Sequence, residues 1–161
     1  MNNWEQNLRE EEERYLTRSK PVYDRLYKEH KLVKNKELQS KLHIDVIATN
    51  FRDEKLLIEE KHVAKDYERI FLETYSCTNT KLTDGWIKFT YPDSIKEQIL
   101  LNFTMPSYIY SFDMRRLQEW YQTANLTSYQ VHTEKSSNKS QGILVPIAEI
   151  YTCLIARYRV A

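Results

Sequence analysis

The sequence predicts an α+β protein in which N-terminal helices precede a mixed central β-sheet with flanking helices. Three observations support this class. A charged, helix-favouring segment opens the chain, apolar runs of strand length follow it, and amphipathic helical patterns interrupt those runs. Because no internal repeat and no linker rich in Pro, Gly or Ser divides the 161 residues, we expect one domain over residues 1–161.

The first part of the chain is expected to be helical. Residues 4–19 are charged and helix-favouring, and they include the four glutamates Glu10–Glu13. Pro21 suits the first turn of a second helix. The apolar side of that second helix would consist of Val22, Leu26, and Leu32 or Val33. A third, short helix is expected over Asn35–Lys41.

A β-hairpin is expected next. The stretch from Leu42 to Lys61 contains two apolar runs around the polar segment Asn50–Glu54, which is typical of a turn. Residues 66–76 contain β-favouring side chains and predict a further strand. The pattern up to this point is therefore helix, helix, strand, strand, with another strand following.

The middle of the chain continues with strands and one helix. Asp84-Gly85 is a turn signal, and Trp86–Tyr91 alternates with a period of two, which predicts a strand. Ile99–Phe103 and Tyr108–Phe112 are expected to form a second hairpin. Met114–Ala124 has apolar side chains at spacings of three and four, which predicts a helix.

The last part of the chain predicts one more strand pair and a final helix. Ser128–Thr133 and Gly142–Pro146 are the two strands. The final helix is expected to begin at about Pro146, which suits a first helical turn. Its apolar residues would be Ile150, Leu154 and Ile155.

Composition excludes several classes of protein. The net charge is +1, so no field of the whole molecule attracts nucleic acid or an anionic membrane. Gly85 and Gly142 are the two glycines, too few for a Gly-rich phosphate-binding loop or a dinucleotide-binding fingerprint. Cys77 and Cys153 are the two cysteines, which predicts reduced thiols in a cytoplasmic protein. No apolar stretch is long enough to span a bilayer.

Charged residues interrupt both apolar runs of the first predicted hairpin. Opposed residues in an antiparallel hairpin have a constant sum of numbers, and for Asp45 and Glu59 that sum is 104. The implied centre is Arg52, inside the polar turn, so Asp45 is expected to face Glu59 with Cβ atoms about 4.5–5.5 Å apart. Lys61 leaves the same face. Glu60 falls on the apolar side unless a bulge or strong twist redirects it.

Two opposed carboxylates repel each other, and a cation bound between them would offset that repulsion. Oxygen ligands with vacant coordination positions suit Mg²⁺ or Mn²⁺, and Mg²⁺ keeps several waters and uses substrate phosphate oxygens as ligands. Such an ion lowers the pKa of a bound water, and a neighbouring lysine can orient that water or offset charge on phosphate. This set of groups favours phosphodiester hydrolysis.

The motif resembles a known family of nucleases. Asp45, thirteen further residues, and then Leu56-Leu57-Ile58 leading into Glu59-Glu60-Lys61 resembles the PD-(D/E)XK signature. The order helix, strand with Asp, strand with E-x-K is similar to the core of that superfamily. Lys61-x4-Asp66-Tyr67-x5-Glu73 is similar to an extension in some small phage or mobile-element homologues.

The resemblance implies a restriction-endonuclease-like core and a metal-dependent endo- or exonuclease. Its metal ligands would be Asp45 and Glu59, its catalytic lysine Lys61, and its cofactor Mg²⁺ or Mn²⁺. DNA is the expected nucleic-acid partner, ahead of RNA, and a homodimer is expected by analogy, since members often act as dimers. Ile44 stands where the family has a proline.

Three further glutamates are candidates for the site. Family members often add a carboxylate from the first helix, and Glu13, in the run Glu10–Glu13, could supply it. Glu60 would join only if a bulge redirected it. Glu73 ends an apolar run and is either an active-site residue or an exposed strand end. A helix usually follows the E-x-K strand in this superfamily, whereas a strand is expected here.

Two other interpretations stay open. In the first, the chain is a catalytically inactive nuclease-fold module that binds a protein or nucleic-acid partner. In the second, Asp45, Glu59 and Lys61 lie on a solvated sheet face, where a cross-strand salt bridge contributes at most about 1 kcal/mol. A sheet of that kind would be structural and would expose its charges.

Overall fold

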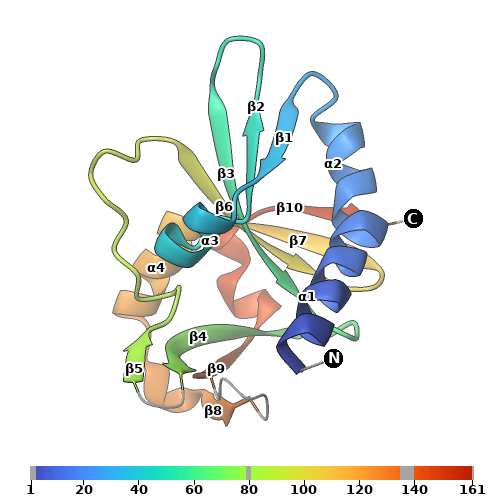
Figure 1. Ribbon diagram of the computed structural model, residues 1–161. Helices are drawn as coiled ribbons and strands as arrows, with labels where there is room; N and C mark the ends of the chain where they lie inside the picture. The colour runs from blue at the N-terminus through green and yellow to red at the C-terminus, as the bar shows by residue number, and fades with distance from the viewer. Residues whose placement is uncertain (1–2, 79–80, 135–139, 161) are drawn as a thin grey trace. The chain divides into compact units, whose positions relative to one another are not determined.

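The computed structural model describes residues 3–78, 81–134 and 140–160 and has a mixed α+β fold (Figure 1). The chain divides into two compact units. The first comprises the described residues up to Asp66, Glu97–Ser111, and those from Ile155 onward; the second comprises Tyr67–Lys96 and Phe112–Leu154. Each unit contains a sheet, so a second sheet accompanies the mixed sheet that the sequence predicted. One domain over residues 1–161 stays a prediction.

The N-terminal segment of the first unit is one continuous helical stretch. It consists of α1 (Asn3–Arg14), a π-helical turn η1 (Tyr15–Ser19), and α2 (Lys20–Leu26) with Pro21 in its first turn, as predicted. Three of its buried side chains recur at intervals of four residues: Tyr15, Ser19 and Tyr23. An α-helix turns in 3.6 residues, and the wider π turn keeps positions spaced by four on one side.

A short strand that the sequence analysis missed follows α2. Residues Leu32 and Val33 were assigned to the second helix, which is wrong, because they belong to β1 (Lys31–Lys34), which pairs with β2. The predicted third helix is confirmed as α3 (Lys36–Leu42). Asn35 begins it by accepting two backbone N–H groups with its side chain, which satisfies donors of the first turn.

The sheet of the first unit is mixed and has the strand order β1-β2-β3-β6-β7-β10. Its further strands are β2 (Val46–Thr49), β3 (Lys55–His62), β6 (Gln98–Thr104), β7 (Tyr108–Asp113) and β10 (Leu154–Arg159). Strands β1, β2 and β3 are successively antiparallel, whereas β3 and β6 are parallel. Both predicted hairpins are present, and the Met105 N–H donates to the Tyr108 carbonyl across the second one.

The helical segment contributes to the core on one face of this sheet. Tyr15 of η1 and Tyr23 of α2 pack with Val46 of β2, Ile58 of β3 and Leu100 of β6 in one buried cluster. Figure 1 shows α1 and α2 running beside β1 and the β2–β3 hairpin. The opposite face of β3 carries Leu57, Glu59 and Lys61, since side chains alternate along a strand.

The second unit contains a sheet with the order β5-β4-β9-β8, in which neighbouring strands are antiparallel. The strands are β4 (Arg69–Thr78), β5 (Lys81–Asp84), β8 (Gln130–Thr133) and β9 (Gln141–Pro146). The predicted helix is α4 (Met114–Thr123), with Asp113 capping its first turn, and a 3₁₀ turn η2 (Leu126–Ser128) follows. The strand predicted at residues 66–76 and the last strand pair are therefore confirmed.

The strand predicted at Trp86–Tyr91 is wrong. Residues of this segment form turns, although Trp86, Ile87 and Tyr91 are buried. The Gln118 side chain donates to the carbonyls of Trp86 and Phe89 and takes the place of a ladder partner. Gly85 lies so close to β4 that a Cβ there would be 2.3 Å from the Glu73 carbonyl oxygen.

The final helix predicted from Pro146 is also wrong in part. A 3₁₀ segment η3 (Ile147–Cys153) is followed by β10, so Leu154 and Ile155 are in a strand. Exposure alternates residue by residue along β10, and β7 supplies its hydrogen-bonding neighbour. Across the described ranges, no helix is both long enough and apolar enough to cross a membrane.

Candidate active site

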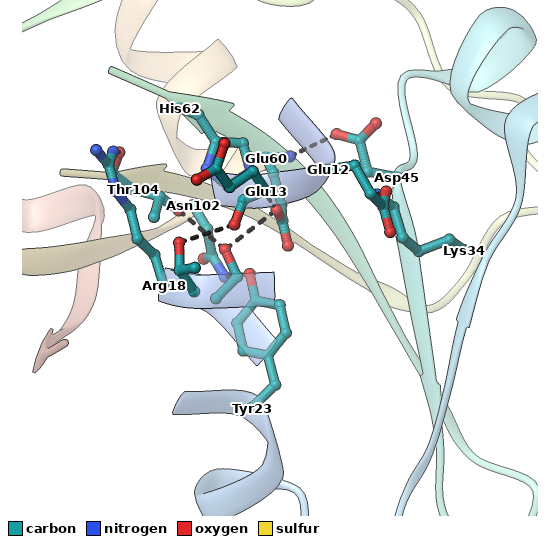
Figure 2. Close-up of polar contacts among 12 residues, drawn as sticks. Glu12, Glu13, Arg18, Tyr23, Lys34, Asp45, Glu60, His62, Asn102 and Thr104 are labelled. Atoms are coloured by element: carbon teal, nitrogen blue, oxygen red, sulfur yellow. Dashed lines mark hydrogen bonds and ion pairs between the residues drawn. The ribbon is translucent and has the colours of Figure 1, made fainter. Parts of the chain in front are cut away.

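The β2–β3 hairpin has the register predicted from the sequence. Val46 pairs with Ile58, and the following pairs keep the sum of 104. Asp45 lies one residue before β2, and its N–H donates to the Ile58 carbonyl at 2.8 Å. Its carboxylate Oδ2 accepts the backbone N–H of Glu60 at 2.7 Å (Figure 2). Asp45 is therefore held at the end of β2, opposite Glu59 of β3.

Glu59 is the most buried carboxylate of this group. It is 2% exposed, and Lys61 Nζ lies 2.6 Å from its Oε1 in an ion pair. Its other oxygen, Oε2, is buried without a hydrogen-bond partner among the described residues. The Lys61 side chain is 32% exposed and reaches solvent. The structure thus brings Asp45, Glu59 and Lys61 together beside a surface that a substrate could approach.

Burial changes the protonation of Glu59. Loss of hydration raises the pKa of this carboxyl well above its ordinary value, and the nearby Asp45 raises it further. The Lys61 ammonium lowers the same pKa but does not outweigh burial. Because Asp45 is 9% exposed and Glu59 is 2% exposed, the interpretation as a solvated sheet face is wrong.

A metal ion at this position would have two protein carboxylates as its ligands. Within residues 3–78, 81–134 and 140–160, no group of three or more His, Cys, Asp or Glu side chains is placed to hold a metal ion. The unpartnered Oε2 of Glu59, next to Asp45, nevertheless fits a hard divalent cation. Such an ion would need water or phosphate oxygens for the remaining positions.

Glu13 and Glu73, the other two candidate carboxylates, lie on α1 and on β4. Glu13 is exposed on α1, and its backbone carbonyl accepts the Thr17 hydroxyl. Glu73 lies on β4 in the second unit, where its Oε1 accepts the Ser76 hydroxyl at 2.6 Å. A role for Glu13 or Glu73 in the site stays a prediction.

Glu60 lies on the opposite face of β3, and no bulge redirects it. The β3–β6 register is unbroken, and Glu60 is paired with Asn102. Glu60 is 8% exposed, and its Oε2 contacts His62 Nε2 at 2.7 Å and accepts the Ser19 hydroxyl at 3.2 Å (Figure 2). It therefore does not join the side chains of Asp45, Glu59 and Lys61.

Further polar groups surround Glu60 beneath the helical segment. Asn102 Nδ2 donates to the Tyr23 hydroxyl at 2.8 Å. Burial, followed by the charge of Glu60, raises the pKa of Tyr23 well above its ordinary value, so the hydroxyl keeps its proton and hydrogen-bonds Glu60. Arg18 donates to the Val63 carbonyl at 2.7 Å. These contacts form a buried polar network between η1, α2, β3 and β6.

This buried network was not predicted from the sequence. Its available signal was the recurrence of Tyr15, Ser19 and Tyr23 at intervals of four within an otherwise charged segment. That pattern indicates a partly polar buried helix face, which needs polar partners on the sheet. Glu60 and His62, spaced by two on the facing strand, are such partners.

No protein-family model, curated protein or solved structure matches this chain. A functional assignment therefore depends on the geometry of the site itself.

Proposed function

We propose that this protein is a metal-dependent nuclease of the PD-(D/E)XK type that hydrolyses phosphodiester bonds, with DNA as the expected substrate. The observation that carries the proposal is the arrangement of Asp45, Glu59 and Lys61 at one end of the β2–β3 hairpin. Two carboxylates lie close together, and a solvent-reaching ammonium is bonded to one of them.

The order of elements in the first unit supports a restriction-endonuclease-like core. A helical segment precedes the strands, Asp45 lies at the start of one strand, and Glu59-x-Lys61 lies on the next. One departure was expected from the sequence: strand β4 follows the E-x-K strand where the superfamily usually has a helix.

Asp45 and Glu59 would hold the metal ion. Glu59 offers the buried Oε2, and Asp45 is kept in place by its bond from the Glu60 N–H. Mg²⁺ accepts such a site because it retains waters and takes phosphate oxygens as ligands. When bound, the ion would supply Lewis acidity toward phosphate and a more acidic water.

Lys61 would act on the substrate directly. Its ammonium is oriented by Glu59 and partly exposed, so it can meet a phosphate oxygen or a water at the scissile bond. Glu59 retains a proton more readily than an ordinary glutamate while no cation is bound. Cation binding should therefore release a proton, and cation affinity should rise with pH.

The test compares DNA cleavage by four proteins. Wild type, Asp45→Asn, Lys61→Ala and the control Lys41→Ala are incubated with plasmid, linear DNA and RNA in Mg²⁺ or Mn²⁺. Lys41 is a suitable control because it is an exposed lysine paired with Glu37 at 2.6 Å, on α3. We expect cleavage by the wild type and Lys41→Ala, which chelation of the metal abolishes, and none by the other two. Equal cleavage by all four, or none by the wild type, rejects the proposal.

A second candidate function is a catalytically inactive module of the same fold that binds a protein or nucleic-acid partner. The observations in its favour are that Lys61 already occupies Oε1 of Glu59 at 2.6 Å and that a third ligating side chain is missing among the described residues. It predicts no heat of Mn²⁺ binding in calorimetry. Mn²⁺ binding that Asp45→Asn removes contradicts it.

A further inference from the structure

The backbone N–H of Glu60 links the two faces of β3. Because β2 begins at Val46, no β2 carbonyl stands opposite this donor, and the Asp45 carboxylate accepts it at 2.7 Å. The bond is buried. The direction of the Asp45 side chain therefore depends on where β3 holds the peptide group of Glu60.

The side chain of that same residue is anchored on the other face. Ser19 of η1, Tyr23 of α2 and His62 of β3 all hydrogen-bond the Glu60 carboxylate. Glu60 and His62 side chains are 4% and 8% exposed, so the anchor is almost completely buried. The helical segment and β3 together thus fix both the side chain and the peptide of Glu60 (Figure 2).

Direct chemistry by these residues does not fit their geometry. Ser19 and His62 contact the same oxygen, Oε2 of Glu60, so they are not arranged as a serine, histidine and carboxylate in series. Ser19 is also fully buried at 0% exposure. The network is therefore in a position to support a site, and it does not reach a substrate.

We propose that Glu60 is a positioning residue for the Asp45–Glu59–Lys61 site. The contacts of Ser19, Tyr23 and His62 hold its side chain, and its N–H in turn holds Asp45 in the direction that a metal ion needs. This inference rests on the proposed function for its consequence, but the mechanical link between the two faces of β3 can be measured without metal.

The first measurement follows the link itself. The amide proton of residue 60 is observed by NMR in wild type, Asp45→Asn, the double variant Ser19→Ala/His62→Leu, and the control Leu100→Ala. A carboxylate acceptor moves an amide proton downfield. The chemical shift of the residue 60 amide in Asp45→Asn is therefore the reference value for a weakened hydrogen bond. We expect the double variant to move toward that shift. The control truncates an apolar side chain of the buried cluster, which cannot hydrogen-bond Glu60, and should stay at the wild-type shift.

The second measurement is Mn²⁺ affinity by calorimetry. Glu60→Ala should weaken binding at least about tenfold, as loss of support around a metal ligand commonly does. Glu60→Gln should stay near wild type because its amide oxygen still accepts hydrogen bonds. Leu100→Ala should lower Tm without changing the affinity.

The outcomes separate the two proposals. An unchanged amide shift in the double variant, or equal Mn²⁺ affinity in wild type and Glu60→Ala, overturns the positioning role. Equal loss of affinity in Leu100→Ala also overturns it, because the effect would then come from general destabilisation. If the double variant shifts the amide but the wild type binds no Mn²⁺, the link stands and the nuclease proposal fails.

Discussion

Two neighbouring glutamates on β3 have the same chemistry and nearly the same burial but different surroundings. Glu59 has one cationic neighbour, a second carboxylate beside it, and a buried oxygen without a partner. Glu60 has Ser19 and His62 bonded to its Oε2 beneath the helical segment, and its Oε1 is likewise buried without a hydrogen-bond partner. Burial and charge alone therefore do not distinguish the two carboxylates. Both glutamates have one buried oxygen without a hydrogen-bond partner, so Glu59 is distinguished by the second carboxylate beside it and by the Lys61 side chain, which reaches solvent.

The strongest test of this comparison replaces each glutamate by glutamine. Glu59→Gln removes the carboxylate that we propose as a metal ligand, and we expect DNA cleavage to fall at least about 10²-fold. Glu60→Gln keeps hydrogen-bond acceptors in the buried network, and its activity should stay within about tenfold of the wild type. Cleavage rates at saturating Mg²⁺ measure both. A larger loss of cleavage rate in Glu60→Gln than in Glu59→Gln would contradict the proposal that Glu59 is the metal ligand and Glu60 the positioning residue.

The Glu60 side can be disturbed separately through Tyr23. Tyr23→Phe removes a hydroxyl that accepts from Asn102 and contacts Glu60, and it leaves a buried donor unsatisfied. We expect the free energy of unfolding to fall by about 1–3 kcal/mol. Urea unfolding measures it, and Tyr151→Phe is the control because Tyr151 is 69% exposed. Equal stability of the two variants would show that the network contributes nothing at Tyr23.

The Glu59 side should show a distinct pH dependence of stability. Its pKa is raised above the ordinary 4.5, so the folded protein binds a proton that the unfolded chain releases. The stability contributed by this proton is complete below pH 4.5 and is lost as the pH rises through the folded-state pKa.

Urea unfolding between pH 4 and 8 compares wild type with Glu59→Gln. Relative to the variant, the wild type should lose at most about 1.4 kcal/mol per pH unit. Mg²⁺ should reduce this loss if it binds the ionised carboxylate. A difference that stays constant, or grows in favour of the wild type with pH, contradicts the raised pKa.

The smallest effect is expected at the far end of the same hairpin. Phe51 is 75% exposed in the turn, where the Asn50 side chain accepts the N–H groups of Arg52 and Glu54. Phe51→Ala should change the free energy of unfolding by no more than about 0.5 kcal/mol. Asn50→Ala, which removes the turn bonds, should cost more in the same denaturation experiment. The reverse order would mean that Phe51 packs in solution.

The register of the β2–β3 hairpin could be predicted because it depends on local information. The polar turn at Asn50–Glu54 and the spacing of Asp45 and Glu59 both require the sum of 104, and the pairs of the ladder have it. Helix α3 could be predicted for the same kind of reason, since Asn35 is a local N-cap. Residues within or directly beside these elements are enough to specify them.

The wrong predictions have non-local causes. Trp86–Tyr91 has the alternation of a strand, but its carbonyls are taken by Gln118, which is far away in the sequence. Leu154 and Ile155 have helical spacing relative to Ile150, but the neighbouring strand β7 draws them into the sheet. Apolar pattern shows that a residue is buried more reliably than it shows the partner of its backbone.

The sequence alone determined that Glu59 and Glu60 leave β3 on opposite faces and that Asp45 and Lys61 accompany Glu59, because side chains alternate along a strand and paired strands have one register. It did not determine which face a helix covers. That depended on Ser19 and Tyr23 meeting Glu60 across more than thirty residues of chain, and on the π-helical turn that directs them. Contacts between distant segments arise from the packing of whole elements, so only the tertiary structure showed that Ser19 of the helical segment bonds Glu60, whereas Glu59 lies beside a lysine that reaches solvent.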